Sequence, residues 1–129
     1  DEIIKGKKII IADDDLLNRT ILRKLLEIKG VQVTEAGSGR KAAELINQGQ
    51  YDMLITDIMM DDMNGYELAI LSREIKKGEK KSMTMMALTG SENEQLKNEE
   101  TKLFDAVLIK PVTAQNLYDT IAKILSTNI

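Results

Sequence analysis

The chain has 129 residues, of which 43% are hydrophobic and 30% charged, and its formal net charge at pH 7 is −3. This length suits one compact domain with a sizeable core, and the slight acidic excess gives no electrostatic reason to expect nucleic acid or an anionic membrane as partner. Cysteine and histidine are absent, which excludes disulfides, thiolate metal sites and histidine as a general base. With no long apolar stretch and no leader pattern, we expect a cytoplasmic domain whose chemistry relies on carboxylates, hydroxyls and lysines.

Five short apolar runs alternate with stretches of helical spacing. The runs cover residues 8–12, 31–36, 53–56, 83–88 and 106–109. Their lack of strict alternation is typical of strands buried on both faces of a parallel sheet. The stretch after the first run has an apolar stripe at helical spacing, formed by Leu17, Ile21, Leu25 and Ile28. The stretch after the last run has a similar stripe, formed by Leu117, Ile121 and Leu125.

Capping residues support the same division of the chain. A residue able to cap a helix precedes each predicted helix: Asp15, Ser38, Asn64, Ser91 and Thr113. Glycines at positions suited to a left-handed helix end follow the first three: Gly30, Gly49 and Gly78. The fourth predicted helix, over residues 92–101, contains Leu96 as its one strongly apolar residue, so little burial stabilises it. Five strand–helix units predict a three-layer α/β fold with helices on both faces of a parallel sheet.

Polar groups follow four of the five predicted strands. They are Asp13, Asp14 and Asp15 after the first strand, Asp57 after the third, Thr89 after the fourth and Lys110 after the fifth. Since the carboxyl ends of parallel strands share one edge, where ligands bind, we expect these groups to converge. Asp15 is assigned to capping the first helix. Each of the remaining residues, taken singly, has an ordinary structural interpretation as a helix cap, a strand end or a surface lysine. A single binding site at the sheet edge explains all of them together.

The residue types at this edge predict a phosphoryl-accepting site. Three carboxylates repel one another, and Lys110 neutralises one charge, which leaves about two negative charges for a hard divalent cation such as Mg²⁺. With the cation present, Asp57 can act as a nucleophile towards phosphorus and form an aspartyl-phosphate. Lys110, the Thr89 hydroxyl and the Gly90 backbone N–H would surround the phosphoryl oxygens.

At these residues the sequence resembles the receiver domain of the response-regulator family. The matching segments are residues 9–15 with 18–19, 57–60 with 63–65, 87–90, and 110–111. The resemblance covers essentially the whole chain and implies a flavodoxin-like (βα)5 doubly wound sandwich with parallel strand order 2-1-3-4-5. Residues 8–129 are expected to form the receiver domain, and residues 1–7 a leader or the end of a linker.

The resemblance also implies a metal site. Asp14, Asp57 and the backbone oxygen of Met59 would bind Mg²⁺ (or Mn²⁺) directly, and Asp13 would act through a bound water and position Lys110. The peptide bond between Lys110 and Pro111 is expected to be cis.

Further implications concern the reaction and its partners. Asp57 would be the phosphoacceptor in two-component signal transduction or a phosphorelay, with Thr89 and Lys110 touching the phosphoryl oxygens. The donor would be a phospho-histidine on a histidine kinase or histidine phosphotransfer protein. The domain would catalyse its own phosphorylation and dephosphorylation while serving as a signalling module.

The setting of the domain is predicted more broadly. Residues 4–8 resemble the lead-in to the terminal receiver of hybrid sensor histidine kinases, so the chain is expected to be the C-terminal receiver of such a kinase or a stand-alone protein. In a hybrid kinase it would form part of the cytoplasmic portion of a membrane-bound sensor. We expect no nucleic acid binding, no direct membrane contact, and a monomer or weak dimer.

Three departures from the family pattern bear on function. Asp61-Asp62 stands where the family commonly has Pro-Gly, Gly90 replaces a frequent alanine, and Val107 occupies the usual aromatic switch position. Without that aromatic residue, the threonine–aromatic rearrangement cannot occur in its usual form. Val107 leaves one alternative open, a phosphorylation-independent pseudo-receiver that binds a partner. A second alternative is an aspartyl-phosphate phosphatase of the haloacid-dehalogenase type, which would read Asp13-Asp14-Asp15 as its Asp-x-Asp pair with Asp13 as nucleophile.

Overall fold

The computed structural model describes residues 2–80, 82–90 and 102–127. The elements are β1 (Lys8–Ala12), α1 (Leu16–Ile28), β2 (Gln32–Ala36), α2 (Gly39–Gln48), β3 (Met53–Asp57), α3 (Gly65–Ile75), β4 (Thr84–Thr89), β5 (Ala106–Ile109) and α5 (Ala114–Thr127). Among these elements a helix follows each of the strands β1, β2, β3 and β5, as the sequence predicts. The weak helix predicted over residues 92–101, with its cap Ser91, lies outside the described residues.

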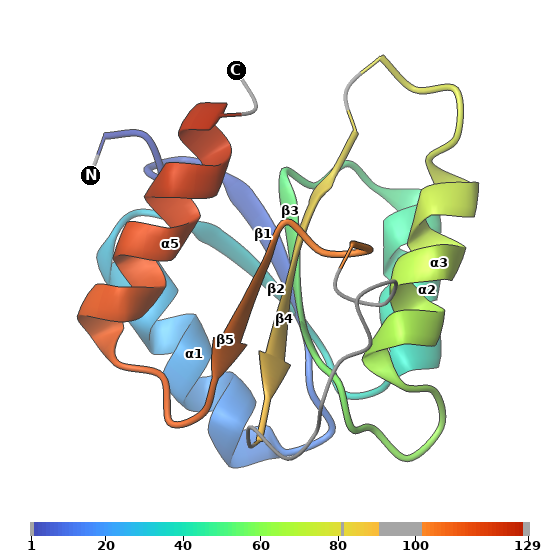
Figure 1. Cartoon of the computed structure of the whole chain (residues 1–129), viewed down its shortest axis with the longest axis horizontal. Coiled ribbons are helices and arrows are strands. Elements are labelled where there is room, and N and C mark those ends of the chain that lie inside the picture. Colours follow the sequence, from blue (N-terminus) through green and yellow to red (C-terminus); the bar gives the residue numbers. More distant parts are fainter. Residues whose placement is uncertain (1, 81, 91–101, 128–129) are drawn as a thin grey trace.

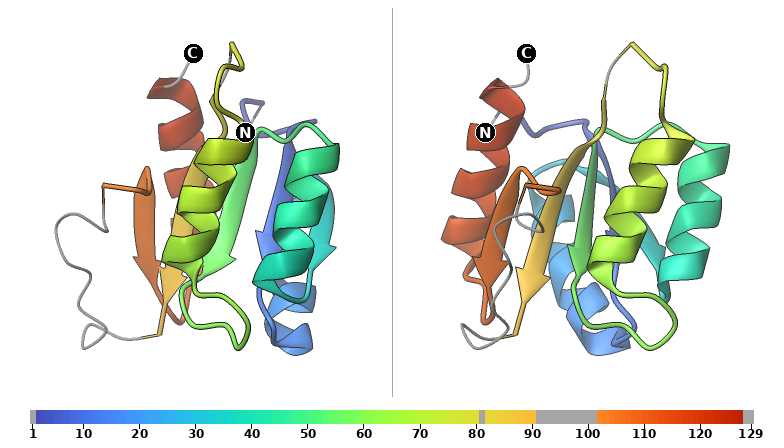
Figure 2. Two further views of the ribbon diagram at one scale, coloured as in Figure 1. Left: turned by 90° about the vertical axis from the view of Figure 1, so that its right-hand side faces the viewer. Right: turned by 45° about the vertical axis from the view of Figure 1, so that its right-hand side comes forward.

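The strands form one parallel sheet in the order β2-β1-β3-β4-β5, which confirms the predicted flavodoxin-like topology. Helices α1 and α5 cover one face of this sheet, and α2 and α3 cover the other (Figures 1 and 2). Each strand alternates its side chains between two separate cores, as β1 illustrates: Ile9 and Ile11 join the core under α1 and α5, while Ile10 joins the core under α2 and α3. All three isoleucines are fully buried, which is why the strand reads as a continuous apolar run.

Most of the predicted helix ends are confirmed. Asp15 and Ser38 cap α1 and α2, and Asn64 forms a complete capping box with Glu67 at the start of α3. The Thr113 hydroxyl accepts a hydrogen bond from the backbone N–H of Asn116 at 3.1 Å, so it caps α5.

The glycine predictions are confirmed at two positions and wrong at the third. Gly30 and Gly78 adopt the left-handed conformation, with φ of 83° and 88°. Gly49 instead has extended backbone, with φ of −136° and ψ of 179°. At Gly49 the chain leaves α2 directly towards β3, so no left-handed turn is needed.

The apolar stripe predicted for α1 is also corrected. The helix is present, but Leu22 and Leu26 are its buried residues, whereas Leu17, Ile21 and Ile28 are exposed. The apolar side of α1 is wide and includes both the predicted stripe and the buried pair, so spacing alone did not select the part that packs on the sheet. The stripe predicted for α5 is buried throughout, at Leu117, Ile121 and Leu125.

The segment before β1 packs against the domain. Ile4 is fully buried in the core under α1 and α5, and the Gly6 backbone N–H donates to the Gly30 carbonyl at 2.9 Å. Within the described residues, no helix has the length and apolar character required to cross a lipid bilayer.

Candidate functional site

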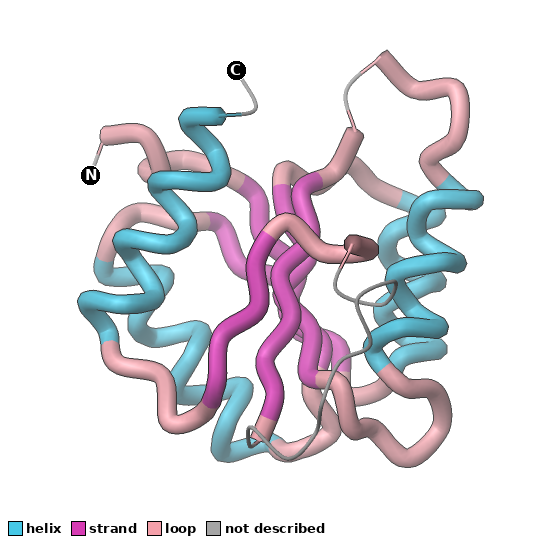
Figure 3. The backbone as a smooth tube through the Cα atoms, viewed as in Figure 1, coloured by secondary structure: helices cyan, strands magenta, loops and turns pink. Residues whose placement is uncertain are grey.

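The polar groups predicted from the strand ends meet at one edge of the sheet. Asp13 follows β1 directly, Asp57 and Thr89 are the last residues of β3 and β4, and Lys110 follows β5 directly. The described loops that leave β1, β3 and β5 gather at that edge, at the bottom of the tube in Figure 3. The parallel topology is the cause, since it places all the strands' carboxyl ends together.

Three carboxylates form the acidic part of the site. Asp13, Asp14 and Asp57 each offer an oxygen, and these oxygens all lie within 4.8 Å of one another. Asp13 and Asp57 are buried, with 3% and 7% of their surface exposed, whereas Asp14 is exposed at the rim. The cluster is therefore a small acidic recess with one open side.

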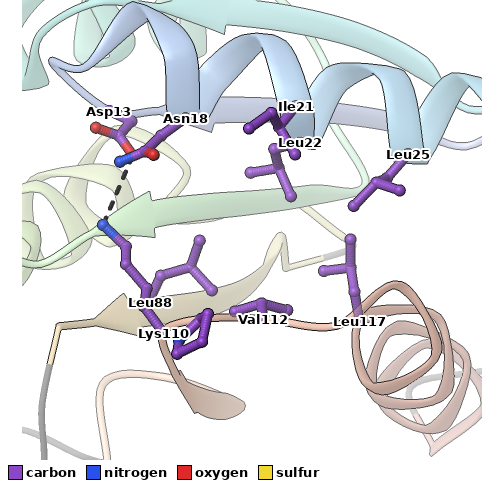
Figure 4. Close-up of a pocket in the computed structure, with 10 residues that line it drawn as sticks. Asp13, Asn18, Ile21, Leu22, Leu25, Leu88, Lys110, Val112 and Leu117 are labelled. Atoms are coloured by element: carbon purple, nitrogen blue, oxygen red, sulfur yellow. Dashed lines mark ion pairs between the residues drawn. The ribbon is translucent and has the colours of Figure 1, made fainter.

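Lys110 supplies positive charge to this recess. Its Nζ lies 3.1 Å from Asp57 Oδ1 and 3.8 Å from Asp13 Oδ2, and Figure 4 marks the second of these ion pairs. Burial raises the pKa of Asp57 above its ordinary value, while the hydrogen bond and charge of Lys110 act in the opposite direction. The peptide bond between Lys110 and Pro111 is cis, as the resemblance implied.

Asp13 is held in place by its neighbours. Its Oδ1 accepts a hydrogen bond from the Asp15 backbone N–H at 2.9 Å, and its carbonyl accepts one from Arg19 at 2.7 Å. The same Arg19 guanidinium forms an ion pair with Glu35 of β2 at 3.3 Å. Nothing in the spacing of the sequence links Arg19 to Glu35, so this support for Asp13 appears in the tertiary structure alone.

The loop from β3 to α3 closes tightly over the end of β3. The Gly65 backbone N–H donates to the Ile58 carbonyl at 2.8 Å. A Cβ atom on Gly65 would lie 2.7 Å from the Asp57 carbonyl oxygen, so a side chain there would displace the backbone of the phosphoacceptor candidate. Met59, two residues past Asp57, has a side chain that is exposed in this loop.

An apolar cavity of about 410 Å³ opens beside the acidic recess. Asp13 and Lys110 line one end, and Ile21 and Leu25 of α1 face Leu117 of α5 along its length (Figure 4). The site thus joins a charged recess to an apolar surface.

The donor set fits a hard divalent cation. The chain has no cysteine or histidine, and clustered carboxylate oxygens are ligands that Mg²⁺ or Mn²⁺ prefers. The lysine compensates one carboxylate, which leaves negative charge in the recess for a cation to balance. A carboxylate beside a lysine and a cation site is suited to accepting a phosphoryl group.

Comparison with known proteins agrees with this chemistry. The family model described as the response regulator receiver domain matches residues 9–122. The chain belongs to this family. It is a receiver domain of two-component signalling, and this favours the predicted function over the phosphatase and pseudo-receiver alternatives.

Relatives of this receiver domain include both large and small proteins. It is 33% identical to hybrid signal transduction histidine kinase L of Dictyostelium discoideum and 36% identical to the sensor protein EvgS of Escherichia coli, over 90% and 81% of the chain. The chain spans 7% and 8% of those two proteins. It is also 36% identical to the response regulator receiver protein CpdR of Brucella abortus, covering 92% of this chain and 97% of that protein.

Solved structures agree with the family. The CheY-like receiver domain from Methylobacillus flagellatus superposes with a TM-score of 0.82 at 25% identity, over 93% of this chain and 99% of that one. The response regulator protein TrrA from Thermotoga maritima, solved in complex with Mg²⁺ and BeF, gives a TM-score of 0.79 at 26% identity, over 92% and 98% of the two chains. Receiver domains bind Mg²⁺ at an acidic pocket of the kind that this domain contains.

Proposed function

We propose that this receiver domain accepts a phosphoryl group on Asp57 from a phospho-histidine of a histidine kinase or phosphotransfer protein. The observation that carries the proposal is the placement of Asp57, which is buried at the end of β3, 3.1 Å from Lys110 and clustered with two further carboxylates. A single phosphoryl-accepting site accounts for Asp57, Lys110 and the two other carboxylates together, whereas a purely structural role would have to be found for each of them separately.

In the proposed step, an oxygen of Asp57 attacks the phosphorus of the donor. A P–O bond to Asp57 forms as the P–N bond to the imidazole breaks, and the electron pair of that bond stays on the imidazole nitrogen. Lys110 stabilises the negative charge on the phosphoryl oxygens, and we assign the Thr89 hydroxyl at the end of β4 to the same task.

Asp14, Asp57 and the Met59 backbone oxygen would hold Mg²⁺, and Asp13 would act through water. The clustered oxygens of Asp13, Asp14 and Asp57 support this assignment. When bound, the cation neutralises charge on the transferring phosphoryl group. Asp13 would also keep Lys110 aimed at the site, since its buried carboxylate lies 3.8 Å from the lysine nitrogen.

Incubation with Mg²⁺ and a small acyl phosphate tests the phosphoacceptor. We expect one phosphoryl adduct per chain, located on Asp57 by mass spectrometry. The Asp57 carboxylate lies 3.1 Å from Lys110 Nζ, closer than the Asp13 carboxylate at 3.8 Å. The Asp57→Asn variant should carry no adduct. An adduct on Asp13 would instead support the phosphatase alternative, and an unlabelled wild-type chain would support the pseudo-receiver.

The face of α1 beside the site is suited to docking of a protein donor. Leu17 and Ile21 are exposed by 67% and 52%, and Ile21 lines the cavity that ends at Asp13 and Lys110. A donor that presents its histidine to Asp57 must cover the mouth of the recess, and apolar surface there would be buried in the complex. We therefore assign this face to the donor.

Replacing Ile21 by serine should slow phosphotransfer from a phosphorylated histidine phosphotransfer protein by about tenfold, since loss of a buried isoleucine costs over 1 kcal/mol. Labelling by acyl phosphate should be unchanged, because the small donor needs no docking surface. Ile70→Ser on α3 is the matched control, since Ile70 is exposed by 53% against 52% for Ile21. Equal phosphotransfer rates in the two variants would contradict docking at α1.

A further inference from the structure

The loop between β3 and α3 is attached to two other parts of the domain through consecutive residues. The Asp61 backbone N–H donates to Asp14 Oδ2 at 3.2 Å, which ties the loop to a proposed metal ligand after β1. The Asp62 side chain reaches the other way, to the first turn of α2. These two residues stand where the family commonly has Pro-Gly.

Asp62 uses both of its carboxylate oxygens in this contact. Oδ1 accepts from the Gly39 backbone N–H at 3.0 Å, and Oδ2 accepts from the Arg40 backbone N–H at 2.9 Å. The Arg40 N–H and then the Gly39 N–H hold the pKa of Asp62 below its ordinary value, so the side chain is ionised at neutral pH. A carboxylate at the positive end of a helix is further stabilised by the helix dipole.

The α2 helix does not depend on Asp62 for its own N-cap. Ser38 already fills that position, with its hydroxyl accepting from the Lys41 backbone N–H at 3.1 Å. Asp62 lies 23 residues after Gly39 in the chain, and its carboxylate satisfies two donors that Ser38 does not reach. The contact therefore joins the β3–α3 loop to the first turn of α2, and it restrains the loop as well as capping the helix.

Packing reinforces the polar contact. A Cβ atom on Gly39 would lie 2.8 Å from Met63 Cβ, so the loop rests directly against the backbone of the first turn of α2. Met63 also packs against the core under α2 and α3. The segment that contains Met59 is thus held between the end of β3, the Asp14 side chain and α2.

We infer that Asp62 is a positioning residue for the Mg²⁺ site, which acts by fixing the β3–α3 loop on α2. This inference rests on the proposed function, because Met59 in the same loop is the residue whose backbone oxygen would bind the cation. A loop already held in one position loses little conformational entropy when its backbone oxygen binds the cation. A loop freed from α2 must be ordered on binding, and the entropy it then loses weakens the affinity for Mg²⁺. Asp62 touches neither cation nor phosphoryl group in this scheme.

The Mg²⁺ dissociation constant of the intact domain, measured by titration calorimetry without any phosphoryl donor, tests the inference. We expect Asp62→Ala to weaken Mg²⁺ binding by about tenfold more than Asp61→Ala, the low end of the range for residues that orient metal ligands. Both variants lose one exposed carboxylate beside the site, so Asp61→Ala measures the effect of the lost charge. Amide hydrogen exchange at Gly39 and Arg40 should accelerate in Asp62→Ala alone.

A second control separates the loop from the helix. Ser38→Ala removes the N-cap of α2 without touching the loop, and we expect it to lower stability by about 1 kcal/mol while leaving Mg²⁺ affinity unchanged. At saturating Mg²⁺, labelling of Asp62→Ala by acyl phosphate should return close to the wild-type rate, since the reacting groups are intact.

Two outcomes would overturn the inference, and they differ in whether they also contradict the proposed Mg²⁺ site. Equal Mg²⁺ affinities in Asp62→Ala and Asp61→Ala would remove the positioning role and leave the proposed function standing. A wild-type domain that binds no Mg²⁺ would remove the metal site and this inference together. Failure of Asp57 to become labelled, with the difference in Mg²⁺ affinity present, would remove the proposed function alone.

Discussion

Replacing Lys110 by alanine is expected to slow acyl-phosphate labelling of Asp57 by about 10²–10³ at saturating Mg²⁺, the usual cost of losing one charged group that stabilises a transition state. The reason is geometric, because Lys110 Nζ lies 3.1 Å from Asp57 Oδ1, where the oxygens of the proposed phosphoryl group would lie. Initial rates of adduct formation, followed by intact-protein mass spectrometry, measure the effect. Lys123→Ala on the outside of α5 is the control, since its side chain is exposed.

The same variant should bind Mg²⁺ at least as tightly as the wild type. Lys110 and the cation compete to neutralise the same carboxylates, Asp13 and Asp57, so losing the lysine leaves more negative charge for the cation. A Lys110→Ala variant that lost Mg²⁺ binding together with labelling would indicate a disrupted site and would contradict a direct role in phosphoryl transfer.

Replacing Asp57 by asparagine is expected to stabilise the domain in the absence of divalent cations, by about 1 kcal/mol at neutral pH. Burial raises the pKa of Asp57 above its ordinary value of 3.8, so the folded state favours the neutral carboxyl. Neutral Asp57 therefore adds to the free energy of unfolding at pH values below the pKa that this carboxyl has in the unfolded chain. This contribution is lost as the pH rises through the higher pKa that Asp57 has in the folded domain. At neutral pH the wild type therefore bears the cost of a buried charge that asparagine avoids.

Urea unfolding with a chelator, repeated from pH 7 towards the ordinary carboxyl pKa, measures this difference. The gap between Asp57→Asn and wild type should narrow as the pH falls and Asp57 becomes protonated in the folded domain. Added Mg²⁺ should reverse the order, since a ligand at 100 times its dissociation constant stabilises the folded state by about 2.7 kcal/mol. An asparagine variant less stable than wild type at neutral pH without Mg²⁺ would contradict the account.

Val107 is a departure from the family pattern that bears on how phosphorylation would be read. It lies in the middle of β5, half-buried against the core under α2 and α3, at the position where the family commonly has its aromatic switch. A valine offers no ring to move between two orientations. The contact of Asp62 with α2 connects the β3–α3 loop to a helix through a residue that stands where the family commonly has Pro-Gly.

The sequence alone determined the sheet, the predicted helix starts outside residues 91–101, and the four strand ends that form the site. Runs such as residues 9–12 and 53–56 are short and largely apolar on both faces, as expected of strands buried on both sides. Capping residues such as Asp15 and Asn64 act on their own helix within three residues. Because the strands are parallel, Asp57 and Lys110 had to share an edge whatever their separation in the chain. Local chemistry and topology were sufficient for these features.

Tertiary structure decided what depends on partners distant in sequence. Spacing could not show that α1 buries Leu22 and Leu26 and exposes Ile21, since all three lie on its wide apolar side. Nor could it show that Asp62, recognisable in the sequence as an added charge, would bind the first turn of α2. Both features arise from surfaces that exist once the layers have packed, and donor docking at α1 and the positioning role of Asp62 depend on them.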